Sequence, residues 1–229
     1  GLKHLVGQKG AKRICTIYQD DDFGLEVMRG GEAALKDLGM DYTERTTYKR
    51  GSTDFSSQVA RMKEANCEIV VMGTIIRETI GTIGTARKSG FNPDFIGTTA
   101  SYFDIIHKLG GPAMNGFYSM GSINYPYEDD PSRNVRDWFQ RYKQAFKEDP
   151  TIMSVYGYQI ISYFEAAAEK AGAKLNVDSY IDALERSTIP RDVFGADKFS
   201  YSKTKHLGSK RPRLCQHQEG RWRCITDHL

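Results

Sequence analysis

Three consecutive carboxylates followed by an aromatic residue and a glycine are the first residues that could do chemistry. Asp20 and Asp21 precede Asp22-Phe23-Gly24, and Asp-Phe-Gly is the tripeptide that binds metal in protein kinases. A kinase would also carry a glycine-rich loop, a strand lysine and an H-R-D loop, and the sequence contains none of them. The acidic run therefore needs another explanation, which depends on the elements around it.

Motifs for other chemistries are missing as well. The chain has no dinucleotide-binding G-x-G-x-x-G, no P-loop and no G-x-S-x-G nucleophile elbow. A phosphoacceptor receiver domain would need an aspartate after the third strand, where Gly73 and Thr74 stand instead. We therefore predict a protein that is not an enzyme and uses no cofactor. An enzyme acting at the strand ends is the alternative from another functional class, and turnover of a bound metabolite would reveal it.

Composition narrows the class of protein further. The chain has 229 residues, of which 39% are hydrophobic, so it can build a sizeable core. The net charge of +3 is too small to indicate nucleic-acid binding. No apolar run approaches the roughly 18 to 20 residues that span a bilayer, and residues 1–12 lack the apolar core of a signal peptide. We expect a soluble globular chain.

The region 201–223 is basic, with a single acid, Glu219. Its basic residues are Lys203, Lys205, Lys210, Arg211, Arg213, Arg221 and Arg223. We interpret them as a solvated rim, with docking to an acidic membrane partner as the alternative. No nucleic-acid-binding motif accompanies them.

The cysteines fall into two groups. Cys215 and Cys224 flank a segment in which Glu219-Gly220 can form a two-residue turn, and that turn places the two cysteines opposite each other in a hairpin. A disulfide is therefore possible there, and two reduced thiols facing each other are the alternative. Cys15 and Cys67 lie in or beside apolar strands and are interpreted as core residues. Because no CxxC pair occurs and the histidines are scattered, we expect no metal site.

The first half of the chain alternates between strand-like and helix-like segments. The strands are predicted at 13–18, 42–48, 67–73, 94–98 and 116–121, and the helices at 25–38, from "STDF" (52–55), at 77–89 and from a Ser-x-x-Asp capping box at 101–104. This pattern predicts an α/β fold with a doubly wound parallel sheet, whose ligands bind at the carboxyl ends of the strands. The loops at that edge are 19–24, 49–53, 74–77 and 98–102.

Two later helices carry broad apolar faces. Residues 132–147 place Val135, Trp138, Phe139, Tyr142 and Phe146 on one face, and the next helix does the same with Ile160, Ile161, Phe164, Ala168 and Ala171. Both faces need a sheet to cover. We expect these 229 residues alone to leave the faces exposed.

Several segments together resemble one family. "DDDFG", "GSTDFSSQVARMKEANCEIVVMGT", "GTARKSGF" and "VYGYQIISYFEAAAEKAG" are similar, in order, to periplasmic branched-chain-amino-acid-type (type I) solute-binding proteins of ABC importers. The resemblance runs from about residue 10 to the C-terminus. It implies two Rossmann-like lobes with a hinge, a small-molecule ligand, a membrane permease as partner, a periplasmic or extracellular location and a monomeric full-length protein. A ligand-sensing domain of a receptor or regulator is the alternative with the same fold.

The family's chain path also implies a division of the chain. Residues 1–122 resemble the second α/β lobe, residues 123–211 would be helices and a strand that return to the first lobe, and residues 212–229 would be a C-terminal hairpin of the second lobe. The first-lobe sheet has no counterpart in this sequence.

The resemblance supplies the candidate ligand contacts, which are Phe23, Thr74, Ile75, Arg77, Thr99, Tyr102 and Tyr156. Phe23 would face the cleft or pack in the core, while Asp20 and Asp21 would sit at a helix N-terminus, where negative charge is favoured. The two tyrosines would offer rings and hydroxyls to a ligand or be core residues.

Two of these positions bear on the ligand. Arg77 could grip a carboxylate with two parallel hydrogen bonds, or pair with Glu78 in the first turn of its helix. Thr99 stands where an amino-acid-binding member would be expected to carry a carboxylate for the ligand's ammonium group. We therefore favour a small organic acid, such as an aromatic acid, over an amino-acid-like ligand.

Overall fold

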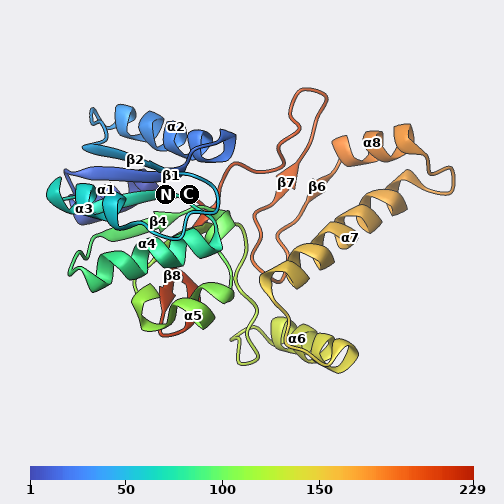
Figure 1. Ribbon diagram of the computed structural model, residues 1–229. Coiled ribbons are helices and arrows are strands. Elements are labelled where there is room, and N and C mark those ends of the chain that lie inside the picture. The colour runs from blue at the N-terminus through green and yellow to red at the C-terminus, as the bar shows by residue number, and fades with distance from the viewer. The chain divides into compact units, whose positions relative to one another are not determined.

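The computed structural model describes residues 1–229, which form two compact units. Unit 1 comprises residues 1–121, 213–227 and 229, and unit 2 comprises residues 122–212 and 228. Figure 1 shows the elements of both units along the chain.

Unit 1 is built on a seven-stranded sheet with the order β2-β1-β3-β4-β5-β8-β9. Its strands are β1 (Ile14–Gln19), β2 (Glu44–Tyr48), β3 (Ile69–Gly73), β4 (Asp94–Gly97), β5 (Tyr118–Gly121), β8 (Arg213–Gln218) and β9 (Arg221–Cys224). The first five strands are parallel, and β8 and β9 extend the sheet as an antiparallel hairpin. The predicted α/β class with a mainly parallel sheet is confirmed.

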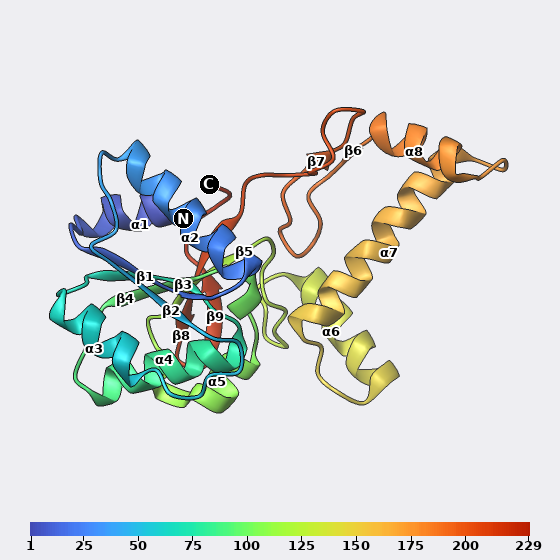
Figure 2. The same ribbon diagram turned by 45° about the horizontal axis from the view of Figure 1, so that its top comes forward.

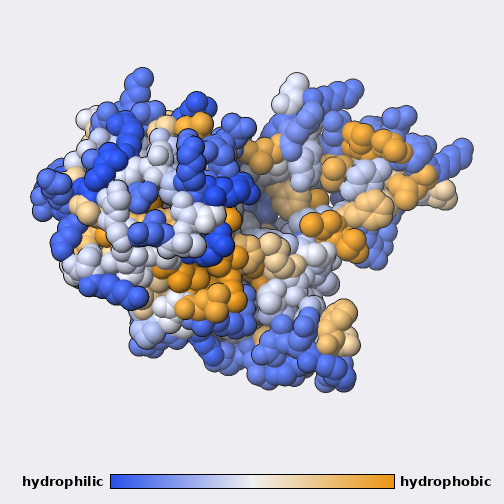
Figure 3. Space-filling model, in the orientation of Figure 1, coloured by the Kyte–Doolittle hydropathy of each residue, from blue (hydrophilic) through white to orange (hydrophobic).

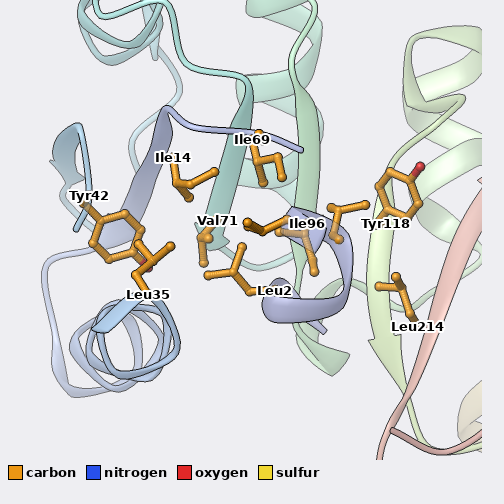
Figure 4. Close-up of a cluster of buried hydrophobic side chains, with 12 residues drawn as sticks. Leu2, Ile14, Leu35, Tyr42, Ile69, Val71, Ile96, Tyr118 and Leu214 are labelled. Atoms are coloured by element: carbon orange, nitrogen blue, oxygen red, sulfur yellow. The ribbon is translucent and has the colours of Figure 1, made fainter. Parts of the chain in front are cut away.

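Helices cover both faces of this sheet (Figure 2). Helices α1 (Leu2–Lys9) and α2 (Asp22–Asp37) cover one face, and α3 (Ser56–Glu64), α4 (Ile76–Lys88) and α5 (Ile105–Gly110) cover the other. Figure 4 shows the core on the first face, where Leu2 and Leu35 reach Ile14, Ile69 and Val71. Helix α1 was not predicted from the sequence.

The loop after β4 differs from the prediction of a helix opened by Ser101 and Asp104. The Thr98 hydroxyl accepts the Ala100 amide at 3.2 Å and opens a short 3₁₀ helix, η1 (Thr99–Ser101). Helix α5 begins only at Ile105, and Asp104 makes no side-chain cap hydrogen bond. The predicted capping box is wrong because the threonine three residues earlier caps the turn. A second 3₁₀ helix, η2 (Gly111–Met114), follows α5.

The C-terminal hairpin has the predicted register. Residues 215–218 pair with 224–221, and Glu219 and Gly220 both have positive φ, at 49° and 80°, as a type I′ turn requires. The sulfur atoms of Cys215 and Cys224 are bonded in the structure.

A second disulfide joins Cys15 and Cys67. Cys15 lies in β1 opposite Val70, and Cys67 stands just before β3, so the parallel pairing of the two strands brings the sulfur atoms together. Both cysteines are buried, as predicted for core residues. The bond between them was not predicted, because they are 52 positions apart in the sequence.

Unit 2 contains α6 (Arg133–Phe146), α7 (Ile152–Ala171), α8 (Val177–Glu185) and the two-residue strands β6 (Thr188–Ile189) and β7 (Phe199–Ser200). Its core forms around Trp138, whose ring centroid lies 4.9 Å from that of Phe194. Gln159 and Tyr163 of α7 both donate hydrogen bonds to the Asp192 carboxylate. Helix α7 is thereby tied to the segment between β6 and β7.

The predicted apolar faces of α6 and α7 are exposed in part. Phe146, Ile160, Ile161 and Phe164 are 63%, 65%, 65% and 49% exposed, which confirms the prediction for these four residues. Figure 3 shows hydrophobic residues gathered on the surface over α7 and α8. The prediction is wrong for Val135, Trp138 and Phe139, which are buried. For Trp138, the ring of Phe194 supplies part of the cover.

None of the helices combines the length and the apolar character needed to cross a bilayer.

Candidate functional site

The candidate ligand residues of unit 1 follow three neighbouring strands. Strands β1, β3 and β4 lie side by side and run in the same direction, so their carboxyl ends share one edge of the sheet. Phe23 follows β1, Ile75 and Arg77 follow β3, and Thr99 follows β4. The fold therefore brings these four residues to one edge, although they span most of the first hundred positions.

The acidic run at this edge caps a helix. Asp21 is the N-cap of α2, and its carboxylate accepts the Gly24 amide at 3.1 Å. The Arg50 guanidinium donates to the same carboxylate at 2.9 Å, and this interaction, followed by the hydrogen bond from Gly24, holds the pKa of Asp21 below its usual value. Asp20 forms an ion pair with Lys49 at 3.4 Å. Asp21 thus stabilises the start of α2, and both acids are paired with cations.

Gly24 is required where it stands. A Cβ atom on Gly24 would lie 1.9 Å from the Gln19 carbonyl oxygen, so only glycine lets the first turn of α2 approach the end of β1 so closely. The neighbouring Phe23 is partly exposed and belongs to the first turn of α2. Its ring is therefore not fully enclosed in the core.

The loop from β3 to α4 contains one buried and two exposed candidates. Thr74 is fully buried, and its hydroxyl shares a 2.6 Å hydrogen bond with the Thr79 hydroxyl, so its side chain is directed into unit 1. Ile75 is 38% exposed and is the N-cap of α4. The Arg77 side chain is 66% exposed and donates to Glu78, which is 1% exposed, at 3.2 Å. The exposed surface of this loop is formed by an aliphatic side chain and a guanidinium.

The loop after β4 also divides into exposed and buried residues. Thr99 is exposed, whereas Tyr102 is 1% exposed and its ring centroid lies 5.0 Å from that of Trp222. Tyr156 belongs to unit 2, where burial raises the pKa of its hydroxyl and a hydrogen bond with Ser122 opposes that shift. Thr99 is thus the exposed candidate of this loop, and Tyr102 packs beneath it.

Sequence reasoning missed two residues that support this edge. Tyr48 donates to the Gly73 carbonyl oxygen at 3.3 Å, and burial raises the pKa of its hydroxyl. Trp222 donates to the Phe103 carbonyl oxygen at 2.9 Å. Glu78 was expected only as the alternative partner of Arg77, and the structure confirms that pair.

No group of three or more His, Cys, Asp or Glu side chains is arranged to hold a metal ion. The exposed candidate groups at the strand ends are an aromatic ring, an aliphatic side chain, a hydroxyl and a guanidinium, and the ion pairs of Asp20 with Lys49 and of Asp21 with Arg50 lie at the same edge. Such a set can bind an organic molecule through contact area and hydrogen bonds.

Comparison with known proteins gives the class of this fold. Residues 1–218 match the family model described as periplasmic binding protein. Since the match covers nearly the whole chain, the chain belongs to the periplasmic binding protein family. Its relatives and structural neighbours identify it as a type I member of that family, as the sequence resemblance implied.

The curated relatives are distant and longer. A Leu/Ile/Val-binding protein homolog 7 of Brucella abortus is 22% identical over 157 residues, which are 67% of this chain and 38% of that protein. A Leu/Ile/Val-binding protein homolog 8 of the same organism is 20% identical over 185 residues, which are 78% of this chain and 45% of that protein. The matched region thus spans less than half the length of these relatives.

Solved structures with similarly low sequence identity share the fold. A fatty acid ABC transporter substrate-binding protein from Thermomonospora curvata has a TM-score of 0.84 and 20% identity, covering 100% of this chain and 61% of that one. A branched chain amino acid ABC transporter from Thermus thermophilus with bound valine has a TM-score of 0.82 and 15% identity, covering 100% and 63%.

Proposed function

We propose that this chain is part of a substrate-binding protein of an ABC importer, which captures a small organic solute and delivers it to a membrane permease. Family membership is the observation that carries the proposal, since this family and its structural neighbours are binding proteins. The protein would act in the periplasm or outside the cell, where two disulfides would persist.

The ligand is proposed to rest on the strand ends of unit 1. Phe23, Ile75, Arg77 and Thr99 come from adjacent loops, and their side chains are partly or fully exposed. An aromatic ring and an aliphatic side chain provide contact area, and the guanidinium provides donors for a carboxylate. Thr74 and Tyr102 are proposed to support the loops from below, because both side chains are buried.

The preferred ligand is a small carboxylate, with aromatic acids as the first group to test. Arg77 is a cation on this edge, and its side chain stays two-thirds exposed although it pairs with Glu78. Threonine at position 99 offers a hydroxyl and no charge for an ammonium group. The neighbours that bind fatty acids or valine show that this fold accommodates acids of different shape.

A further lobe is proposed to complete the site. The two solved neighbours above align with the whole of this chain, but the aligned region is only 61% to 63% of their own length. Those proteins therefore contain a large additional segment. The exposed side chains of Ile160, Ile161 and Phe164 are proposed to pack against such a segment. Residues 1–122 and 212–229 would then belong to the second lobe, and residues 123–211 would return to the first. Solute capture would follow from lobe closure, driven by tighter binding of the ligand to the closed state.

A thermal-shift screen of the full-length protein tests this proposal. Aromatic carboxylates, fatty acids and branched-chain amino acids are each added in excess, and the melting temperature is recorded. Since a ligand that binds only the folded state stabilises it by mass action, we expect at least one carboxylate to raise the melting temperature. Chemical modification of a bound solute during incubation, detected by mass spectrometry, would contradict a pure binding role.

A further inference from the structure

The hairpin β8–β9 contacts the loop 98–104 through the side chain of Trp222. The indole Nε1 donates to the Phe103 carbonyl oxygen at 2.9 Å, and the ring lies 5.0 Å from the ring of Tyr102. The Tyr102 hydroxyl lies 3.6 Å from the sulfur of Cys224. Trp222 is only 3% exposed. The hairpin is thus packed directly against the loop that carries Thr99.

Two histidines stack beside this contact. The ring centroids of His107 in α5 and His217 in β8 lie 5.3 Å apart at an interplanar angle of 27°, and His217 also lies 5.6 Å from Trp222. His217 is 1% exposed. Neither of its ring nitrogens, nor Nδ1 of His107, makes a hydrogen bond of normal geometry within the protein, although the Met114 backbone lies close enough to His217 to act on its pKa. Such a buried stack is favourable while both rings are neutral and is opposed by protonation of either.

The charged groups near the two histidine rings do not offset the cost of protonating either ring. Asp104, the N-cap of α5, and Lys108 within α5 act on the pKa of His107 in opposite directions and form an ion pair with each other at 2.5 Å. From η2, the group that acts on His217 is the Met114 carbonyl, and from β9 it is the Trp222 ring. Burial, followed by repulsion from His107, lowers the pKa of His217 to about 4, and Met114 opposes this shift. Burial also lowers the pKa of His107.

The direction of the pH effect follows from these shifts. In the packed state His217 stays neutral until the pH falls to about 4. When the hairpin separates from α5, the ring meets water and its pKa returns to about 6.5. Acidification between these two values therefore adds protons to the separated state and favours it.

We propose that Trp222 is a positioning residue for the loop 98–104, and that protonation of the His107–His217 pair loosens this positioning in acid. The proposal rests on the proposed function in one respect, since it makes Thr99 part of the ligand-binding loop. Solute affinity would then be coupled to the pH outside the cell membrane through the hairpin.

Hydrogen exchange of the full-length protein, measured by mass spectrometry, tests this proposal without any ligand. In the wild-type protein, we expect the protection factors of residues 98–104 to be about tenfold lower at pH 5 than at pH 7.5, after correction for intrinsic exchange. Residues 69–73 of β3 serve as the internal reference and should keep their protection. The double variant His107→Phe/His217→Phe keeps two aromatic rings that cannot be protonated, so its loop should be equally protected at both pH values.

Two further variants separate positioning from general stability. Trp222→Phe removes the donor to Phe103 and should lower the protection of residues 98–104 at pH 7.5 while leaving β3 unchanged. His4→Phe, on the exposed side of α1, should keep the wild-type pH response. Equal loss of protection in the loop and in β3, or a pH response that persists in the double histidine variant, would overturn the proposal.

If the double histidine variant does not fold, nuclear magnetic resonance titration of the wild-type imidazoles replaces it. The proposal requires that the His217 ring titrates well below 6 and that the loop resonances shift with it, and a ring that titrates near 6.5 would refute it. Because neither experiment contains ligand, a negative result would leave the proposed solute binding intact. Conversely, failure of the thermal-shift screen would leave the hairpin coupling standing.

Discussion

Arg77 and Glu78, consecutive residues in the first turn of α4, form an ion pair between an exposed guanidinium and a buried carboxylate. Such a pair holds the cation at the strand-end surface while most of the guanidinium stays in contact with solvent. The carboxylate beneath it keeps Arg77 oriented without enclosing it. The pair with Glu78 is the alternative that the sequence left open for Arg77, and the exposed remainder of the guanidinium is what supports proposing an acid as ligand.

Removing the Arg77 side chain should weaken ligand binding. For the carboxylate that raises the melting temperature most, Arg77→Ala should lower the affinity measured by calorimetry about tenfold to a hundredfold, because a charge-assisted hydrogen bond is lost. The free energy of unfolding should also fall, by about 1 to 3 kcal/mol, because the buried Glu78 carboxylate loses its partner. Arg29→Ala, an exposed arginine of α2, is the matched control and should change neither quantity. An unchanged affinity in Arg77→Ala would remove Arg77 from the site.

Phe23 is expected to contribute to binding rather than to the core. Because the ring is partly exposed, Phe23→Ala should lower the free energy of unfolding by about 1 kcal/mol or less, whereas Phe95→Ala, at a fully buried position, should cost about 3 to 5 kcal/mol. Ligand affinity should fall at least about tenfold in Phe23→Ala and be retained in Phe23→Tyr. Urea unfolding and calorimetry provide the two measurements. A stability loss in Phe23→Ala as large as that of Phe95→Ala would show that the ring is a core residue.

Two glycines of α2 should respond to alanine with opposite signs. Gly24→Ala should destabilise the protein by about 2 to 3 kcal/mol, because the added methyl group would overlap the Gln19 carbonyl oxygen. Gly30→Ala, where nothing lies within 4 Å of the added atom, should stabilise it by about 0.5 to 1 kcal/mol through helix propensity. Chemical denaturation of both variants decides the matter, and a neutral Gly24→Ala would contradict the close approach of α2 to β1.

The two disulfides should differ in their contribution to stability. Cys15 and Cys67 are 52 positions apart and Cys215 and Cys224 are 9 apart, so the loop-entropy model assigns about 4 kcal/mol to the first bond and about 3 kcal/mol to the second. Replacing each pair by alanine and comparing the free energies of unfolding checks this order. Thiol labelling of denatured protein provides the control, since free thiols in protein from an oxidising compartment would show that the bonds do not form.

Much of unit 1 could be predicted because its signals are local. The β-branched run 67–73, the alternating segment around 44–48 and the Glu219-Gly220 turn each specify their element through a few neighbouring residues. The register of the hairpin followed from its turn alone. Helix α1 was missed because its eight residues carry only a weak apolar stripe. Its Leu2, Leu5 and Val6 are buried only because the helix packs against the sheet.

The candidate site was predictable only at the level of loops. Alternation of strands and helices identifies which loops share an edge, but the exposure of each side chain depends on tertiary neighbours. Thr74 can be buried because its hydroxyl shares a hydrogen bond with the hydroxyl of Thr79, one turn into α4. Tyr102 is buried because Trp222, 120 positions later in the chain, returns through the hairpin. Neither partner could be assigned from local sequence.

Native mass spectrometry of the full-length protein tests the central claim most directly. The wild-type protein, purified without denaturation and incubated with the best carboxylate from the screen, should carry one additional mass equal to that carboxylate. The double variant Phe23→Ala/Arg77→Ala should carry none at the same concentration, while the matched variant Arg29→Ala should resemble the wild type. Equal ligand occupancy in the wild type and the double variant would contradict the account, because the solute would then bind elsewhere than on the strand ends of unit 1.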